Sequence, residues 1–304
     1  MGKEKEMIIG IIANVTKDNV FEVVSTLIEK LKSRELGFLL GDSLYEKREL
    51  LQVKALKANF ADNDNLCKKS DIILSIGGDG TMLASAFKAH KYDKPVMGIN
   101  LGKLGFLAEA NINQMDVFID DIKKGRYKID KRIVIESNCC GHKIEKLFAI
   151  NDIVIDKGGW PKMIDLTIYV DDEYVTTFAA DGLIVATPTG STGYSISTGG
   201  PIVSPRADVI TLSPISPHSL TVRPLVLSGN QVITIKANSL HKELHVNCDG
   251  QRVFSFSPPL ELRIRKCERP LKLVHTSLSN YYETLRNKLL WGIDLRKNSL
   301  NNQD

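Results

Sequence analysis

The segment with the clearest chemical potential is Ile72–Thr81, where an apolar run leads into a glycine-rich turn with the sequence Gly-Gly-Asp-Gly-Thr. Glycines allow backbone N–H groups to approach an anion closely, and a helix that begins directly afterwards adds donors and partial positive charge. A carboxylate in such a place repels phosphate, so its presence indicates a functional role. Asp79 is therefore expected to accept a proton from an attacking hydroxyl or to hold Mg²⁺ against phosphates. The alternative is an ordinary turn in which Asp79 or Thr81 caps the helix.

A second candidate segment, Thr187–Pro201, consists almost wholly of Gly, Ser, Thr and Pro, apart from Tyr194 and Ile196. Small side chains permit close contact between a backbone and a polar ligand, and hydroxyl groups can bind ribose or phosphate oxygens. The alternative is a long, partly disordered surface loop, because Gly/Ser-rich stretches are often flexible.

The elements that would position the first segment are short buried strands alternating with helices. Apolar runs predict strands at Met7–Ala13, Asp71–Ile76 and Pro95–Ile99, and helical spacing predicts helices at Phe21–Leu31, Thr81–Ala89 and Asn113–Lys124. This alternation indicates a parallel α/β sheet. Open sheets of this kind bind ligands at the carboxyl ends of their strands, which is where the glycine-rich turn lies.

From about Lys131 the pattern changes to strand-like segments separated by turns, which predicts a mainly β half. These segments are Arg132–Ser137, Leu147–Ile155, Met163–Val170, Glu173–Phe178, Gly182–Ala186, Gln231–Ala237, Glu243–Asn247, Arg252–Phe256 and Leu260–Arg265. Asp171-Asp172 and Asp249-Gly250 have the composition of hairpin turns. A final helix is expected at Ser279–Leu290.

Several motifs, in their order along the chain, resemble those of the NAD kinase family. They are the 77–81 turn, Leu104-Gly105-Phe106-Leu107, Asn151-Asp152, and Asp181-Gly182 followed by Thr187-Pro188-Thr189-Gly190-Ser191-Thr192. The 77–81 turn alone is also similar to that of diacylglycerol-type lipid kinases and related to that of phosphofructokinases, whereas the 187–192 stretch is more specific. The resemblance spans most of the chain.

The resemblance implies an α/β N-terminal domain with a parallel Rossmann-like sheet at residues 1–125. A mainly β, dinucleotide-binding domain would follow at residues 126–276, and the C-terminal helix, within 277–304, would pack back on the first domain. The implied reaction transfers the γ-phosphoryl group of ATP, with Mg²⁺ or another divalent cation, to the 2′-hydroxyl of the adenosine ribose of NAD, giving NADP. The family also implies a homodimer or homotetramer with active sites near subunit boundaries.

Residue by residue, the resemblance makes Asp79 the acceptor of the hydroxyl proton. The motif matches place twelve residues in the NAD site: Asp79, Gly80, Phe106, Asn151, Asp152, Asp181, Thr192, Gly193, Tyr194, Ser195, Ile196 and Ser197. Spacing alone adds Lys162, Ala179 and Gln251 to this site. Contacts with ATP phosphates are expected from Gly77, Gly78, Gly80, Thr81 and Arg223. The alternative for Arg223 is a structural role, in which it pairs with other groups of the protein. No dedicated metal-ligating residues are expected.

Three positions differ from the family pattern. Asp152 stands where the family usually has Glu, which keeps the charge but shortens the reach by one methylene. Gly193 replaces the alanine of many members, so the loop is expected to be looser. Ala179 stands where some bacterial enzymes that reject NADH have Arg, which leaves the choice between NAD and NADH as substrate open. The sequence also leaves open whether ATP or polyphosphate is the phosphoryl donor and whether NADP(H) exerts feedback.

The composition of the 304 residues is that of an ordinary globular protein, with 43% hydrophobic and 25% charged residues. The formal charge of +4 is too small to indicate a nucleic-acid or membrane partner. The five cysteines, Cys67, Cys139, Cys140, Cys248 and Cys267, have no spacing typical of a metal site or a disulfide framework. The charged N-terminus lacks a signal-peptide pattern, which predicts a cytoplasmic location.

Two other classes of protein fit part of this pattern. A lipid kinase of the diacylglycerol class would share the 77–81 turn but would not need Thr187–Tyr194. A nucleotide-binding regulator without catalytic activity would bind a dinucleotide, but it would gain little from the Asp79 carboxylate facing phosphates.

Overall fold

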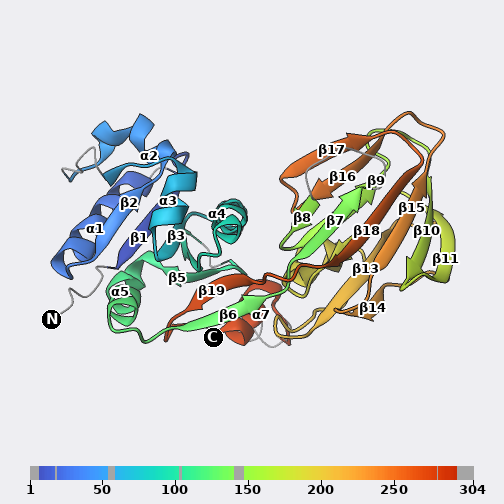
Figure 1. Ribbon diagram of the computed structural model, residues 1–304. Helices are drawn as coiled ribbons and strands as arrows, with labels where there is room; N and C mark the ends of the chain where they lie inside the picture. Colours follow the sequence, from blue (N-terminus) through green and yellow to red (C-terminus); the bar gives the residue numbers. More distant parts are fainter. Residues whose placement is uncertain are drawn as a thin grey trace, which may run out of the picture. The chain divides into compact units, whose positions relative to one another are not determined.

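The computed structural model describes residues 7–17, 19–53, 59–102, 105–139, 147–278 and 280–292. They group into two compact units, one within Met1–Asp130 and Leu273–Asp304, the other at Lys131–Lys272. The first combines a mostly parallel sheet with helices, and the second consists of antiparallel sheets (Figure 1). This arrangement confirms the expected fold class. Leu104 and Cys140, which the sequence analysis named, lie outside the described residues.

The first unit is built on a sheet with the strand order β2-β1-β3-β4-β19-β6, in which β5 also pairs with β4. Its strands are β1 (Ile8–Ala13), β2 (Gly37–Leu40), β3 (Ile72–Ile76), β4 (Val96–Asn100), β5 (Ala108–Asn111), β6 (Lys128–Arg132) and β19 (Leu271–His275). Its helices are α1 (Val20–Ser33), α2 (Asp42–Glu46), α3 (Asn63–Lys69), α4 (Asp79–Lys91), α5 (Met115–Lys123) and α7 (Tyr281–Leu289), with 3₁₀ turns at Arg48–Leu50 and Ile112–Gln114.

Apolar residues on both faces of the central strands explain why helices cover this sheet on both sides. On one face Ile9 and Ile11 share a buried cluster with Leu27 of α1. On the other face Gly10 allows α3 to approach closely, since a Cβ there would lie 2.5 Å from Ser70 Oγ. The sheet is therefore buried between two helical layers, as parallel sheets generally are.

The second unit contains two antiparallel sheets, with strand orders β11-β10-β15-β18-β7-β8 and β14-β13-β12-β9-β16-β17. Their strands are β7 (Ile135–Cys139), β8 (Leu147–Ala149), β9 (Asp152–Asp156), β10 (Ile164–Val170), β11 (Glu173–Ala180), β12 (Gly182–Ala186), β13 (Val209–Ile215), β14 (Leu225–Ser228), β15 (Ile233–Asn238), β16 (Leu244–Cys248), β17 (Arg252–Phe256) and β18 (Leu260–Lys266). A 3₁₀ helix at Thr189–Thr192 and helix α6 (Tyr194–Ser197) follow β12.

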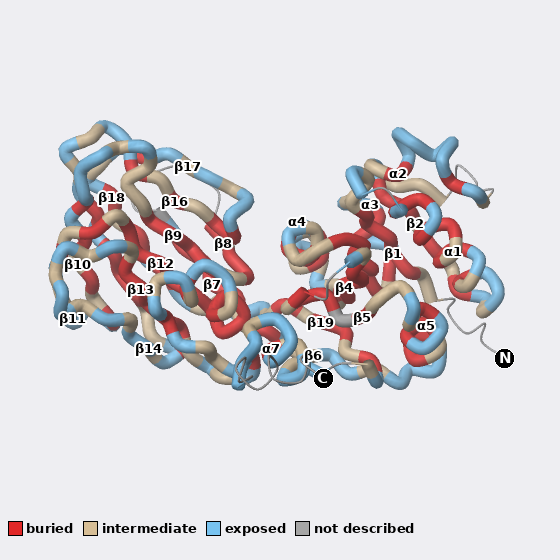
Figure 2. Tube along the Cα trace, turned by 180° about the vertical axis from the view of Figure 1, so that it is seen from behind, coloured by how far each residue is buried: buried red, intermediate tan, exposed pale blue. Residues whose placement is uncertain are grey.

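The two sheets of the second unit share one hydrophobic core. Leu166 and Leu262 of one sheet belong to the same buried cluster as Ile153 and Leu183 of the other. Along β10, buried residues alternate with more exposed ones, as expected for strands with one face toward a core. Figure 2 shows this buried layer running through β12, β13 and β18.

The turns expected from composition are present, but two expected strands are each divided. Asp171 and Asp172 have φ of 51° and 68°, and Asp249 has φ of 58°, as tight hairpin turns require. The expected strand Arg132–Ser137 is divided between β6 and β7 because the chain passes there from the sheet of the first unit to a sheet of the second. The expected strand Leu147–Ile155 is divided between β8 and β9.

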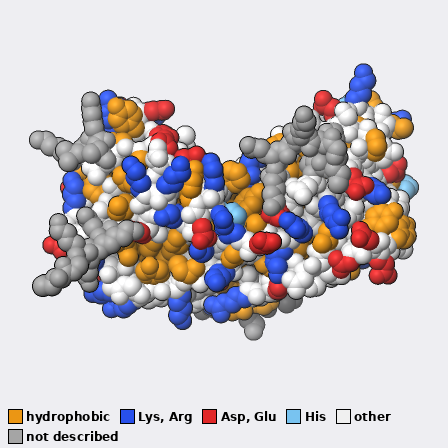
Figure 3. Space-filling view, in the orientation of Figure 1, with side chains coloured by type: hydrophobic (Ala, Val, Ile, Leu, Met, Phe, Trp, Pro, Cys, Tyr) orange, Lys and Arg blue, Asp and Glu red, His pale blue; other side chains and the backbone are white. Residues whose placement is uncertain are grey.

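Charge and hydropathy are unremarkable along the chain. No helix within the described ranges is both long and apolar enough to cross a membrane. Lys and Arg side chains are interspersed with Asp and Glu over the face shown in Figure 3, in agreement with the small net charge of +4.

Candidate active site

The glycine-rich turn connects β3 to helix α4, which begins at Asp79. The Gly77 N–H donates to the Ile99 carbonyl of β4 at 2.9 Å, which fixes the turn to the sheet. A Cβ at Gly77 would lie 2.5 Å from Thr81 Oγ1, whereas a Cβ at Gly78 would have no atom within 4 Å. The first glycine is thus required by packing, and the second leaves the amino end of α4 open to a ligand.

The Asp79 carboxylate is held in place by the connection between β4 and β5. Its Oδ2 accepts a hydrogen bond from the Phe106 N–H and its Oδ1 accepts one from the Leu107 N–H, both at 3.1 Å. A side chain at Gly105 would collide with the same carboxylate. The 105–107 segment therefore orients Asp79, a role that the sequence did not reveal. The Asp79 side chain is 34% exposed, so it remains accessible.

A cavity of about 470 Å³ lies beside this turn within the first unit. It is lined by Lys17, Asn19, Gly77, Gly78, Asp79, Asn100, Leu101, Gly102, Gly105 and Lys288. Lys288 of α7 was not predicted, yet its Nζ lies 3.5 Å from Asp79 Oδ2 and 5.1 Å from the centre of the Phe106 ring. Its contact with Asp79 also shows that the C-terminal helix packs on the first unit.

In the second unit a buried aspartate causes the break between β8 and β9. Asp249 Oδ1 accepts hydrogen bonds from the N–H groups of Ile150 at 2.9 Å and Asn151 at 2.7 Å, and Arg252 Nη2 donates to Oδ2 at 3.1 Å. Since the carboxylate engages backbone donors between the two strands, the chain bends there. The composition of the turn indicated its shape, but nothing local in the sequence indicated this partner.

The bend brings Asn151 against the hydroxyl-rich segment. Thr187 donates from its N–H to the Asn151 carbonyl at 2.8 Å and from Oγ1 to the Ile150 carbonyl at 2.6 Å. A Cβ at Gly190 would collide with the Asn151 carbonyl oxygen. The segments Thr189–Thr192 and Tyr194–Ser197 form short helices, so the alternative of a disordered surface loop does not describe them.

Two polar side-chain atoms in this region are buried without a hydrogen-bond partner among the described residues. They are Asn151 Oδ1 and Thr189 Oγ1. Buried polar atoms are nearly always paired, so unpaired ones next to a predicted binding motif are candidates for contact with a ligand.

Asp152 and Asp249 are two buried carboxyl groups in this same region. Burial raises the pKa of Asp152 to about 7, and the nearby charge of Asp249 contributes to the rise. Burial also raises the pKa of Asp249, but the N–H groups of Asn151 and Ile150 oppose that rise. Burial and the charge of Asp249 therefore both favour the protonated form of the Asp152 carboxyl group.

The remaining motif residues of this segment differ in how accessible they are. The Ser195 hydroxyl is buried and shares a 2.9 Å hydrogen bond with Ser213, while the Ser197 hydroxyl donates to the Tyr194 carbonyl at 2.7 Å. Tyr194 is 49% exposed. Thr192 and Ile196 are half-buried, and Gly193 is exposed.

Asp181 and Ala179 lie away from this cluster. Asp181 forms an ion pair with Lys157 at 2.6 Å, and the Ala179 carbonyl accepts a hydrogen bond from the His218 N–H. In the β9–β12 register Gly182 lies opposite Asp156, whereas Ala186 lies opposite Asp152. The two groups of predicted residues therefore lie at opposite ends of a strand pair, about 15 Å apart.

Three further predicted residues lie in turns of the second unit. Lys162 is exposed ahead of β10, and Gln251 is exposed in the turn between β16 and β17. Arg223 is also exposed, and its Nη1 donates to the carbonyls of Leu220 and Val222 in its own loop. These contacts match the structural alternative for the arginine, and its role toward phosphate stays a prediction.

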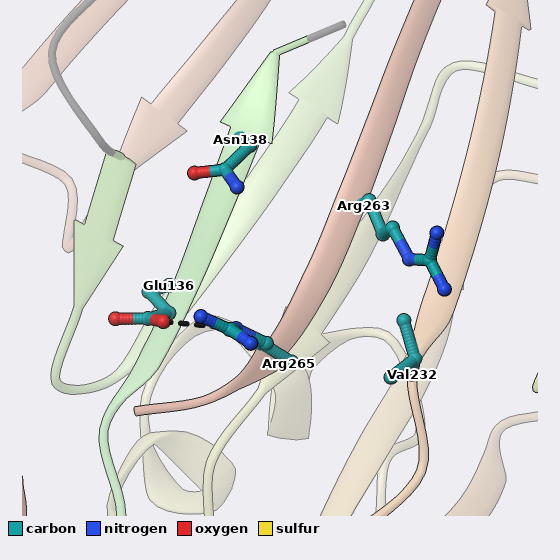
Figure 4. A pocket seen from close by; sticks show the side chains of 5 residues that line it. All are labelled: Glu136, Asn138, Val232, Arg263 and Arg265. Carbon is teal, nitrogen blue, oxygen red and sulfur yellow. Dashed lines mark hydrogen bonds and ion pairs between the residues drawn. The ribbon is translucent and has the colours of Figure 1, made fainter. Parts of the chain in front are cut away.

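A second cavity, of about 270 Å³, lies against β7 and β18 of the second unit. Figure 4 shows Arg265 facing the buried Glu136, with which it pairs at 3.0 Å, while Arg263 lies beside Val232. The motif residues do not line this cavity. In the chain as described, no cluster of three or more His, Cys, Asp or Glu side chains could hold a metal ion.

Comparison with known proteins agrees with this geometry. The profile of the ATP-NAD kinase N-terminal domain matches residues 9–127, and that of the ATP-NAD kinase C-terminal domain matches residues 150–276. The fold and the site define a kinase, a phosphotransferase with an alcohol acceptor. The NAD kinase of Geotalea daltonii is 37% identical over 287 residues, covering 93% of this chain and 98% of the relative. The chain belongs to the NAD kinase family.

Other similar proteins agree with this placement. The NAD kinase of Prosthecochloris aestuarii is 38% identical over 285 residues, 93% of this chain and 96% of the relative. Yeast NADH kinase complexed with NADH has a TM-score of 0.86 at 24% identity, covering 97% of this chain and 90% of that one. An NAD kinase from Archaeoglobus fulgidus in complex with ATP has a TM-score of 0.70 at 27% identity, covering 93% of this chain and 97% of that one.

Proposed function

We propose that this chain transfers the γ-phosphoryl group of ATP to the 2′-hydroxyl of the adenosine ribose of NAD, and that Asp79 accepts the hydroxyl proton. One observation carries the assignment to Asp79. Two backbone N–H groups hold its carboxylate at the amino end of α4, beside an open glycine-lined cavity. Each carboxylate oxygen retains acceptor capacity for a substrate hydroxyl. The Archaeoglobus relative, which was solved with ATP, supports ATP as the donor.

Each unit carries its own group of residues proposed to bind a substrate. The backbone of Gly78 and the first turn of α4 would bind the donor phosphates, because the helix amino end offers N–H donors and partial positive charge. Asn151 and Asp152 would bind NAD hydroxyl or amide groups. The unpaired Asn151 Oδ1 supports this role. Tyr194, half-exposed at the start of α6, would stack on a ring of the dinucleotide.

The cavity residues fit a divalent cation that arrives with the nucleotide. Mg²⁺ keeps several waters and is usually held by substrate phosphates with one or two carboxylates. Asp79 is the carboxylate that lines the cavity, and the described residues offer no larger ligand cluster. When bound, the cation would neutralise phosphate charge and leave Asp79 to orient and deprotonate the hydroxyl.

An active site near a subunit boundary is part of this proposal, because the family resemblance implies a homodimer or homotetramer. Asn151 and Asp181 lie at opposite ends of the β9–β12 pair, a separation that an extended dinucleotide or a second protomer would bridge. A homodimer or homotetramer would bring Asp181 of one protomer to the site of another. Light scattering coupled to gel filtration tests this directly, and a monomer with full activity would contradict it. The cytoplasmic location stays a prediction.

The replacement Asp79→Asn tests the proposed function most directly, because it keeps the shape and removes the base. We expect kcat for NADP formation to fall by about 10²–10⁴-fold, the usual contribution of general base catalysis. Asp64→Asn on α3 is the matched control, since it removes an exposed carboxylate that pairs with Lys91. Wild-type turnover by the Asp79→Asn variant would show that the assignment is wrong.

Labelled ATP distinguishes the two alternative classes. Label transfer to diacylglycerol and not to NAD would identify a lipid kinase. Dinucleotide binding without NADP formation by the wild-type protein would identify a regulator.

A further inference from the structure

The helix α7 returns to the first unit near the end of the chain and places one lysine at the glycine-lined cavity. We infer that Lys288 binds the phosphates of the nucleotide donor, so that α7 is part of the donor site. The inference rests on the proposed function, since it assumes that a polyphosphate occupies this cavity.

The position of the ammonium group carries the inference. Lys288 Nζ lies 3.5 Å from Asp79 Oδ2, and it stands 5.1 Å from the centre of the Phe106 ring. A cation over an aromatic face is attracted by the ring quadrupole, so Phe106 holds the ammonium beside the cavity. The Lys288 side chain is 30% exposed and therefore accessible to a solute.

A positive side chain beside Asp79 would lower the repulsion between this carboxylate and a polyphosphate. A nucleoside triphosphate brings several negative charges toward a carboxylate that is already negative, and two like charges at close range repel strongly in a partly desolvated site. Among the described residues that line the cavity, Lys17 and Lys288 carry positive charge, and Lys288 is the one that contacts Asp79. The helix dipole of α4 adds only partial charge.

A purely structural role explains this contact less well. Half-exposed ion pairs contribute little to stability, and this pair is longer than a strong charge-assisted hydrogen bond. An ammonium group has three donors on a flexible stem. Lys288 can therefore keep its contact with Asp79 and donate to a phosphate oxygen at the same time, which would also keep Asp79 directed at the acceptor hydroxyl.

The test compares Lys288→Gln with two matched variants. Lys288→Arg keeps the charge, and Arg286→Gln removes an exposed positive charge from the same helix, two residues earlier and on a different face. For Lys288→Gln we expect the KM for ATP to rise about tenfold, the effect of one lost charged contact, while the KM for NAD changes less than twofold. Lys288→Arg should recover most of the loss, and Arg286→Gln should behave like the wild type.

A binding measurement separates this inference from the proposed function. Calorimetry with magnesium tripolyphosphate, in the absence of NAD, should show about tenfold weaker binding to Lys288→Gln than to the wild type. Unchanged tripolyphosphate affinity, an effect on NAD alone, or equal losses in Arg286→Gln would overturn the inference. A wild-type protein that forms no NADP would instead refute the proposed function, and the tripolyphosphate comparison would still test Lys288.

Discussion

Two groups of glycines in this protein serve opposite purposes. In the first unit, the Cβ positions of Gly78 and Gly102 have no atom within 4 Å, and both residues line the cavity beside Asp79. In the second unit, a Cβ at Gly190 would collide with the Asn151 carbonyl, and one at Gly200 would lie 2.8 Å from Ser213 Oγ.

The difference shows that some glycines leave open space beside a cavity, whereas others, Gly77 of the first unit among them, permit close packing. In the first unit the open space beside Gly78 and Gly102 is where we propose that the donor phosphates bind. In the second, the backbone must approach another strand closely so that Asn151 and Asp152 are positioned. Substitutions at single glycines can therefore separate effects on catalysis from effects on stability.

Among the glycine substitutions, the largest effect is expected from Gly105→Ala, because the new methyl group would displace the Asp79 carboxylate. Misplacing a catalytic group by about 1 Å can reduce the rate by about 100-fold, and we expect a loss of that size in kcat. Gly159→Ala is the control, since Gly159 does not line the cavity and its methyl group would meet no atom within 4 Å. Equal kcat values for the two variants would show that the position of Asp79 is not critical.

The next largest effect is expected from Gly190→Ala in the second unit. The collision with the Asn151 carbonyl should cost about 2–3 kcal/mol of unfolding free energy, as overpacking of a buried site does. Urea denaturation followed by circular dichroism measures this loss. At Gly193 the nearest atom would be 3.2 Å from the new Cβ, so Gly193→Ala should cost less than about 1 kcal/mol. Equal losses would contradict the comparison.

A pH-dependent effect is expected from Asp152. Its pKa in the folded protein is raised to about 7 from 3.8, so the folded state binds the proton more tightly than the unfolded state. Stability is therefore lost as pH rises from about 4 to about 7, and Asp152→Asn removes that loss. The stability advantage of the variant should grow by about 2 kcal/mol between pH 5 and pH 8. An advantage that is independent of pH would show that the pKa is not raised.

The smallest effect on stability is expected from Gly78→Ala. Its methyl group would meet no atom, so the unfolding free energy should change by less than about 0.5 kcal/mol. The methyl group would project beside the donor cavity, and the KM for ATP should rise several-fold. A loss of stability as large as that of Gly190→Ala would remove the distinction between the two segments.

The sequence predicted the features that depend on neighbouring residues. Helical spacing located α1, alternation located β10, and two acidic turns located their hairpins. The motif order also identified the family correctly. These signals succeed because periodicity and turn conformation are set within a few residues.

The features that escaped prediction depend on contacts between distant residues. Asp249 divides β8 from β9 through hydrogen bonds that reach across 98 and 99 residues, and Lys288 reaches Asp79 across 209. The roles of the 105–107 backbone and of the buried Asp152 likewise emerge only when separate segments pack together. No pattern among neighbouring residues indicates which distant residues will be in contact.

The position of β19 has a consequence for how the protein is made. This strand lies between β4 and β6 in the sheet of the first unit, although it follows the whole second unit in the chain. During synthesis the sheet of the first unit therefore cannot be completed between those strands until the second unit and β19 have left the ribosome. Lys288 follows later still, so the cavity beside Asp79 gains this lining residue only after β19 has been made.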